Sequence, residues 1–72
     1  MAKKLEVQYI NGKSKEVTLE ANINEQTYIN LISTSNLSRR MMDILAVMQI
    51  NGHSDIMHIK SCKVLPEDKV LL

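Results

Sequence analysis

The chain has 72 residues, of which 44% are hydrophobic and 24% are charged, and its formal net charge is +1. This length predicts one domain, residues 1–72, and this composition is typical of a folded globular protein. Nine basic and eight acidic residues nearly balance. The balance argues against nucleic acid or an anionic membrane as the main partner, and it leaves little charge repulsion to oppose self-association.

A single cysteine, Cys62, excludes an internal disulfide and, with only two histidines, a structural zinc site of the usual kind. A lone cysteine in a short domain fits a reducing compartment, and no apolar run is long enough to span a membrane. We therefore expect a cytoplasmic protein without a membrane partner. Tyr9 and Tyr28 are the only aromatic residues, so aliphatic and methionine side chains must fill the core.

Two alternating segments at the start of the chain predict a β-hairpin. Apolar residues alternate with polar ones in residues 5–9 and again in residues 17–21, and Asn11-Gly12 between them favours a turn. A strict two-residue loop would mix apolar and charged residues on both faces. We therefore predict the register that pairs Leu5 with Leu19 and Val7 with Val17, with an odd-numbered loop.

A short helix is expected next. Asn24 is suited to cap it, and Tyr28, Leu31 and Ile32 follow at helical spacing. The polar cluster at residues 33–36 ends it.

Residues 37–48 fit two structures. Leu37, Met41, Leu45 and Met48 suit a helix capped by Ser38, whereas residues 44, 46, 48 and 50 alternate as in a strand. We favour an irregular segment to about Met42 and then a buried strand that ends at Ile50, because a strand covered on both faces reads as a continuous apolar run. The alternative is a two-layer α+β domain with a second helix from Ser38 to Met48.

The last part of the chain predicts turns and short strands. Asn51-Gly52 and residues 66–68 carry turn signals, residues 56–59 suit a short strand or crossing segment, and residues 70–72 suit a closing strand. The predicted fold is α+β: a β-grasp (ubiquitin-like) mixed sheet packed on one short helix.

Several short motifs carry a resemblance that spans nearly the whole chain. It resembles the sulfur-carrier proteins of thiamine and molybdopterin biosynthesis, and it is similar to the TGS domain of threonyl-tRNA synthetases. The motifs are Tyr9-Ile-Asn-Gly12, Val17-Thr-Leu19, Leu31-Ile32, Ala46-Val-Met-Gln-Ile-Asn-Gly52 and Leu65-Pro-Glu-Asp-Lys-Val70. The carrier family implies a flexible tail ending in Gly-Gly that is adenylated and thiocarboxylated. Here the sequence stops at Leu72, and Glu67 stands where the family has a glycine, so no residue inherits the reactive role.

Other candidate chemistry is weaker. His53, Asp55 and His58 form a string that could bind a divalent metal, but such a string after a turn is more often a polar loop. Cys62 lies between Lys60 and Lys63, which would lower its pKa if all three faced solvent, although a buried inert thiol is the ordinary case. We expect no catalytic residue, no metal and no cofactor.

The expected function is that of a non-catalytic binding module that acts through protein contacts, with self-association as a further expectation. Arg39, Arg40, Met41 and Met42 are the candidate partner-binding residues, since methionines make adaptable contacts. One alternative is a sulfur carrier whose Gly-Gly tail is missing. Another is an RNA-contacting, TGS-like module in which the two arginines and Lys3, Lys4, Lys13 and Lys15 contact phosphates.

Overall fold

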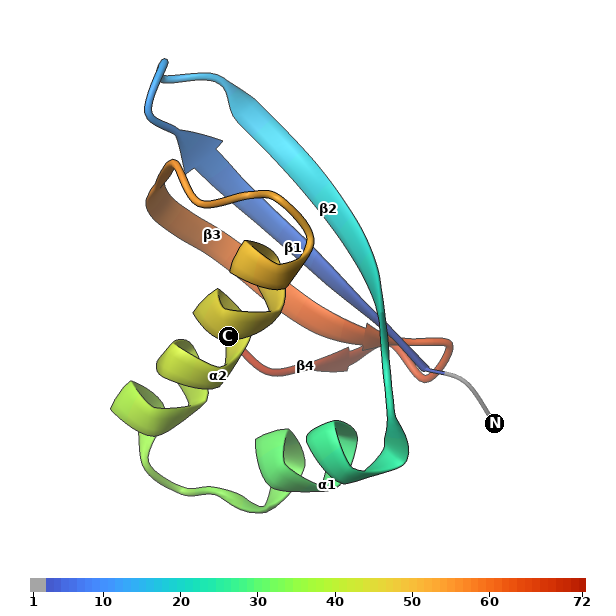
Figure 1. Ribbon diagram of the computed structural model, residues 1–72. Coiled ribbons are helices and arrows are strands. Elements are labelled where there is room, and N and C mark those ends of the chain that lie inside the picture. Colours follow the sequence, from blue (N-terminus) through green and yellow to red (C-terminus); the bar gives the residue numbers. More distant parts are fainter. Residues whose placement is uncertain (1–2) are drawn as a thin grey trace.

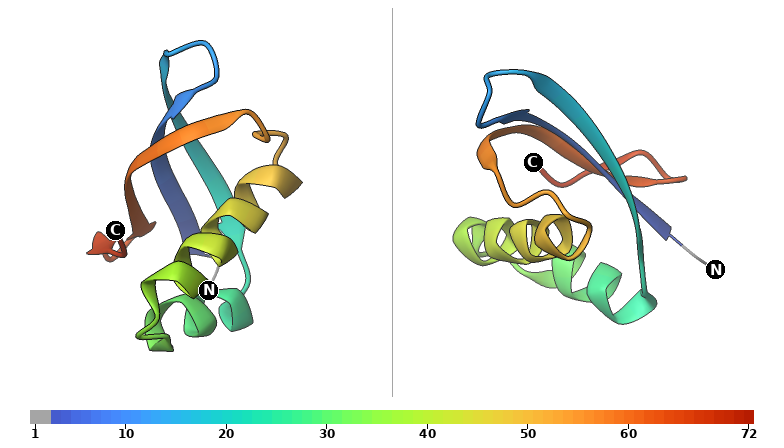
Figure 2. Two further views of the ribbon diagram at one scale, coloured as in Figure 1. Left: turned by 90° about the vertical axis from the view of Figure 1, so that its left-hand side faces the viewer. Right: turned by 45° about the horizontal axis from the view of Figure 1, so that its top comes forward.

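The computed structural model describes residues 3–72, which form a four-stranded sheet and two helices on one of its faces (Figures 1 and 2). The elements are β1 (Lys3–Asn11), β2 (Glu16–Ile23), α1 (Glu25–Ser33), α2 (Leu37–Ile50), β3 (Ile56–Leu65) and β4 (Lys69–Val70). The strand order is β2-β1-β3-β4. The α+β class is therefore confirmed.

All three strand pairings are antiparallel, so the prediction of a mixed sheet is wrong. The segment predicted as a buried central strand, which ends at Ile50, is helical, and the strand beside β1 is instead the ten-residue β3. The sequence predicts only a short strand or crossing segment at residues 56–59, but the strand continues to Leu65, with Cys62 and Val64 buried. This strand runs antiparallel beside β1, and only the two-residue β4 follows it.

The first hairpin has the predicted faces but a different register. β1 pairs Leu5 with Ala21 and Val7 with Leu19, two residues away from the predicted pairing. The loop is longer than expected because Asn11 closes it with its side chain: Asn11 Oδ1 accepts hydrogen bonds from the backbone N–H of Lys13 (2.9 Å) and of Lys15 (3.1 Å). Ser14, and not Gly12, takes the positive φ of 60°.

The first helix is confirmed. Asn24 caps α1, and its side chain accepts from the N–H of Thr27 at 2.7 Å. Leu31 is completely buried against the sheet, and Tyr28 and Ile32 pack at the edge of the core.

Residues 37–50 form α2, so the predicted strand ending at Ile50 and the one-helix fold are both wrong, and the alternative with a second helix is confirmed. Asn36, and not Ser38, is the cap, and its side chain accepts from the N–H of Arg39 at 3.2 Å. Ile44 and Met48 are fully buried, whereas Ile50 is 85% exposed. Burial thus follows the four-residue period of a helix and not the two-residue period of a strand.

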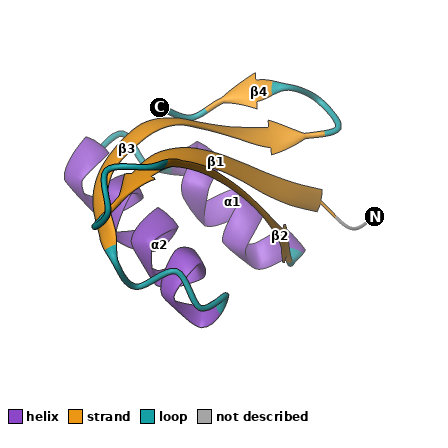
Figure 3. Ribbon diagram, turned by 90° about the horizontal axis from the view of Figure 1, so that it is seen from above, coloured by secondary structure: helices purple, strands orange, loops and turns teal. Residues whose placement is uncertain are grey.

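The core lies between the inner face of the sheet and the two helices (Figure 3). Central β1 contributes three side chains that are at most 1% exposed, and β3, α1 and α2 close over them. The largest fully buried side chains of the core are Tyr9, Leu5, Leu31, Ile44, Met48, Val7, Val64 and Cys62. With one buried aromatic ring, the core is aliphatic, as the composition predicts.

Candidate protein-binding surface

The four predicted partner-binding residues are the third to sixth residues of α2, and they face different ways. Arg39 and Met42 are exposed, and Met42 is 69% accessible. Met41 and Arg40 are half-buried. Since neighbouring helix positions are rotated by about 100°, four consecutive residues cannot form one contact patch.

Arg40 is turned toward the protein's own backbone. Its guanidinium donates to three carbonyl oxygens: Nε to Leu31 (3.1 Å), Nη1 to Leu71 (3.0 Å) and Nη2 to Thr34 (2.6 Å). These carbonyls belong to α1, to the loop that follows it and to the segment after β4. Arg40 therefore joins the helical layer to the end of the chain, and its planar fork suits this task.

The outer side of α2 carries an apolar row that the sequence analysis did not single out. Met42, Ala46 and Ile50 are spaced by four residues and are all exposed. We call these three residues the α2 outer stripe. Their spacing of four residues indicates one face of a helix, but the prediction of a strand that ends at Ile50 assigns Ala46 and Ile50 to a different structure.

Open hollows lie beside this stripe. One of about 200 Å³ is lined by residues of both helices: Thr27, Asn30, Asp43, Ala46, Val47 and Ile50. A second, of about 260 Å³, continues along Asn30 and Asp43 to Arg39. Asp43 borders both, and among residues 3–72 it forms no ion pair. The surface therefore combines apolar side chains with one acid and one base that remain open to a partner.

The charges of α2 are poorly matched to its dipole. The first turn has no acidic residue but contains Arg39, and the last turn has no basic residue. The N-terminal end of a helix carries partial positive charge and the C-terminal end partial negative charge. A negative charge from another molecule would thus stabilise the N-terminal end of α2, and a positive charge would stabilise its C-terminal end.

The residues of the candidate metal string lie in different environments. The hydroxyl of Tyr9 and Nδ1 of His53 are hydrogen-bonded, with the rings edge to face at 5.7 Å between centroids. His58 lies on β3 and is exposed, and within residues 3–72 no three His, Cys, Asp or Glu side chains are grouped to hold a metal. The histidine string is thus not gathered into a site.

Cys62 lies in the core at 1% exposure, and burial raises the pKa of its thiol to about 12. The two neighbouring lysines do not lower it. Nζ of Lys60 pairs with Glu16 at 2.7 Å, and Nζ of Lys63 lies 3.6 Å from Glu6, so both are drawn to the outer face of the sheet. This arrangement describes an inert thiol.

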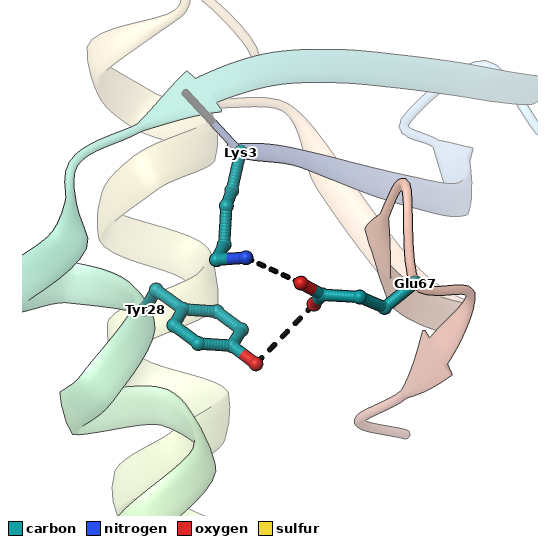
Figure 4. Close-up of polar contacts among 3 residues, drawn as sticks. All are labelled: Lys3, Tyr28 and Glu67. Carbon is teal, nitrogen blue, oxygen red and sulfur yellow. Dashed lines mark hydrogen bonds and ion pairs between the residues drawn. The ribbon is translucent and has the colours of Figure 1, made fainter. Parts of the chain in front are cut away.

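The basic residues considered for phosphate binding are spread over the domain. Lys3 starts β1 and is mostly buried, where its Nζ lies 2.5 Å from Glu67 Oε1 and 4.5 Å from the centre of the Tyr28 ring (Figure 4). Lys13 and Lys15 lie in the hairpin loop at the other end of that strand. The lysines that the RNA-contacting alternative grouped with Arg39 and Arg40 therefore do not form one phosphate-binding patch with Arg39.

Neither helix of the described part is long and apolar enough to cross a membrane. Comparison with known proteins assigns no relative: no protein-family model, no curated protein and no solved structure matches this chain.

Proposed function

We propose that this protein is a non-catalytic protein-binding module whose contact surface is the α2 outer stripe together with Arg39 and Asp43. Of the predicted contact residues, Arg39 and Met42 belong to this surface. Met41 is five residues from Ala46, which places it on the opposite side of the helix and outside this surface, and Arg40 is bonded to the protein's own backbone.

The exposure of the stripe carries the proposal. Ile50 is 85% exposed and Met42 is 69% exposed on one side of a single helix, with the small Ala46 between them. Single exposed apolar residues are ordinary, but a contiguous row with polar neighbours is typical of an interaction site. A methionine and an isoleucine on either side of a small residue suit an incoming helix or loop, because the small residue lets it approach closely and the methionine can adapt to its shape.

The β-grasp relationship is also a proposal. A hairpin, a helix and a later strand that returns beside β1 support it, whereas the antiparallel pairing of that strand departs from the mixed sheet we expected. The binding proposal depends on the surface and not on this relationship. The RNA-contacting alternative loses support from Arg40, whose donors are directed to backbone carbonyls and not to solvent.

Site-specific photo-crosslinking in the cells that make the protein tests the proposal. A photoreactive amino acid at Ile50 or at Met42 is expected to yield discrete covalent adducts. The same group at Thr18, which is exposed on β2 but belongs to the outer face of the sheet, is the matched control. Equal labelling at all three positions, or adducts at Thr18 alone, would contradict the proposal.

A further inference from the structure

We propose that the partner bound at the α2 outer stripe is a second copy of this chain, with the two α2 helices antiparallel and crossing at Ala46. This inference rests on the proposed function, because it names the partner of the same surface. It is argued from the spacing of the stripe, from the charges at the helix ends and from the net charge of the chain.

The stripe is symmetric in spacing about Ala46. Met42 precedes Ala46 by four residues and Ile50 follows it by four, which places each about 6 Å from Ala46 along the helix axis. A two-fold axis through Ala46 therefore sets Met42 against the partner subunit's Ile50, and Ile50 against the partner subunit's Met42. The small side chain at the crossing lets the two helices approach to the usual 8–10 Å. The surface is thus self-complementary, as a two-fold interface must be.

The charges favour the antiparallel direction. Arg39 precedes Ala46 by seven residues and Ile50 follows it by four, so in this arrangement Arg39 lies just beyond the last residue of the partner subunit's α2. Its guanidinium supplies the positive charge that the last turn of the partner helix lacks, and it moves next to a favourable partial charge. A parallel pair would instead place the two Arg39 side chains together at two positive helix ends. The chain's net charge of +1 adds little overall repulsion.

The contact is small, and this sets the expected affinity. Three apolar side chains from each copy give an interface at the low end of the specific range, so the dimer should be weak and in exchange with the monomer. Sedimentation velocity from about 10 μM to about 1 mM should show the average mass rising from the 8.2 kDa monomer toward twice that value.

Variants then assign the association to this surface. Ile50→Lys should abolish it, and Arg39→Glu should weaken it by roughly tenfold because the change acts at both symmetric ends. Thr18→Glu on the outer face of the sheet is the control and should associate like the unchanged protein. A chain that stays monomeric at about 1 mM, or a Thr18→Glu variant that is as defective as Ile50→Lys, would overturn the proposed dimer.

Single cysteines test the direction of the helices. In a glutathione redox buffer, Ala46→Cys should form a disulfide-linked dimer, because the residue lies on the symmetry axis. Met42→Cys and Ile50→Cys should not, since each lies about 12 Å along the axis from its own copy and a disulfide requires Cα atoms within about 7 Å. The buried Cys62 should stay free in all of them.

Linking at all three positions, or at Met42→Cys and Ile50→Cys but not at Ala46→Cys, would overturn the antiparallel arrangement.

The proposed dimer and the proposed binding function can fail independently. A monomeric chain that still gives discrete adducts to a different protein from Ile50 would overturn the second copy as partner and leave the binding function standing. Loss of those adducts as well would overturn both.

Discussion

Arg40 joins three parts of the chain through one guanidinium group. It holds the carbonyls of Leu31 and Thr34, which are left without helical partners at the end of α1, and the carbonyl of Leu71, next to the sheet. Helix ends need such partners because their last carbonyls have no N–H within the helix. A charged donor to several carbonyls is also stronger than a neutral one.

Replacing Arg40 by alanine should lower the free energy of unfolding by about 3 kcal/mol, since three hydrogen bonds to a charged donor are lost at once. Arg40→Lys should recover little of this loss, because one ammonium group cannot reach three carbonyls in a planar fork. Urea unfolding measures both variants. Arg39→Ala, at the exposed neighbouring position, is the control and should change stability by less than about 0.5 kcal/mol. Similar losses for Arg39→Ala and Arg40→Ala would disprove this role.

A second residue-scale connection links Lys3, Tyr28 and Glu67 (Figure 4). Lys3 Nζ pairs with one carboxylate oxygen of Glu67, and the Tyr28 hydroxyl donates to the other at 3.3 Å. The hydrogen bond from Lys3 is the main cause that lowers the pKa of Glu67 below its ordinary value of 4.5, and the bond to Glu67 raises the pKa of Lys3. The turn before β4 is thus tied to β1 and α1.

These directions fix a pH dependence. Because the folded pKa of Glu67 is lowered, its stabilising contribution is present above pH 4.5 and is lost as pH falls through the lowered value. Glu67→Gln should therefore lose less stability on acidification than the unchanged protein, as followed by urea midpoints across that range. Glu20→Gln, at an exposed acid without an ion pair among residues 3–72, should keep the original dependence. An unchanged acid profile in Glu67→Gln would show that the contact contributes nothing.

At the scale of elements, the helical state of α2 was the feature that the sequence predicted least well. Residues 44, 46, 48 and 50 alternate as in a strand, whereas residues 37, 41, 45 and 48 have helical spacing, so periodicity alone supports both structures. The decisive local signal was Asn36, whose side chain caps the backbone N–H of Arg39. It was assigned to the end of the preceding helix, because a polar cluster can both end one helix and begin the next.

The unmatched charge at the start of α2 gives a prediction for this element. Arg39→Glu places an acid at the third helical position after the Asn36 cap. There its negative charge interacts favourably with the positive end of the helix dipole, and its carboxylate can accept a hydrogen bond from the backbone N–H of the cap residue. Dilute protein should gain about 0.5–1 kcal/mol in unfolding free energy, with Arg39→Gln intermediate. This gain is opposite in sign to the loss of self-association expected for the same variant. A destabilised Arg39→Glu monomer would show that Arg39 makes a needed contact within the domain.

At the scale of the whole molecule, the methionines separate into core and surface. Met48 is completely buried beneath α2, whereas Met42 and Met57 are 69% and 66% exposed. In a domain this small a buried methionine carries a large share of the stability, because total unfolding free energies are only about 5–15 kcal/mol.

Met48→Ala should therefore cost about 3 kcal/mol, from lost burial and the cavity left behind. Met42→Ala should change stability by less than about 0.5 kcal/mol, and Met57→Ala provides a second exposed control. Guanidinium unfolding at low protein concentration measures all three without contributions from association. Equal effects of Met42→Ala and Met48→Ala would contradict the packing described here.

Much of this protein follows from local sequence. The alternation in β1 and β2 determined which side chains face the core, Asn24 and the spacing after it determined α1, and one cysteine in 72 residues ruled out an internal disulfide. These features depend on neighbours along the chain, and local periodicity and capping describe such neighbours well.

Only the tertiary structure decided the rest. The direction of β3, which runs antiparallel beside β1, depends on contacts between residues far apart in sequence. The choice between helix and strand for residues 37–50 depends on the same kind of contact in addition to the Asn36 cap. The same is true of the surface: Arg39 and Arg40 are equivalent as letters, yet α2 turns one to solvent and the other to the carbonyl of Leu71. A short apolar sequence satisfies helix and strand equally until the faces it must cover are in place, and packing then selects one.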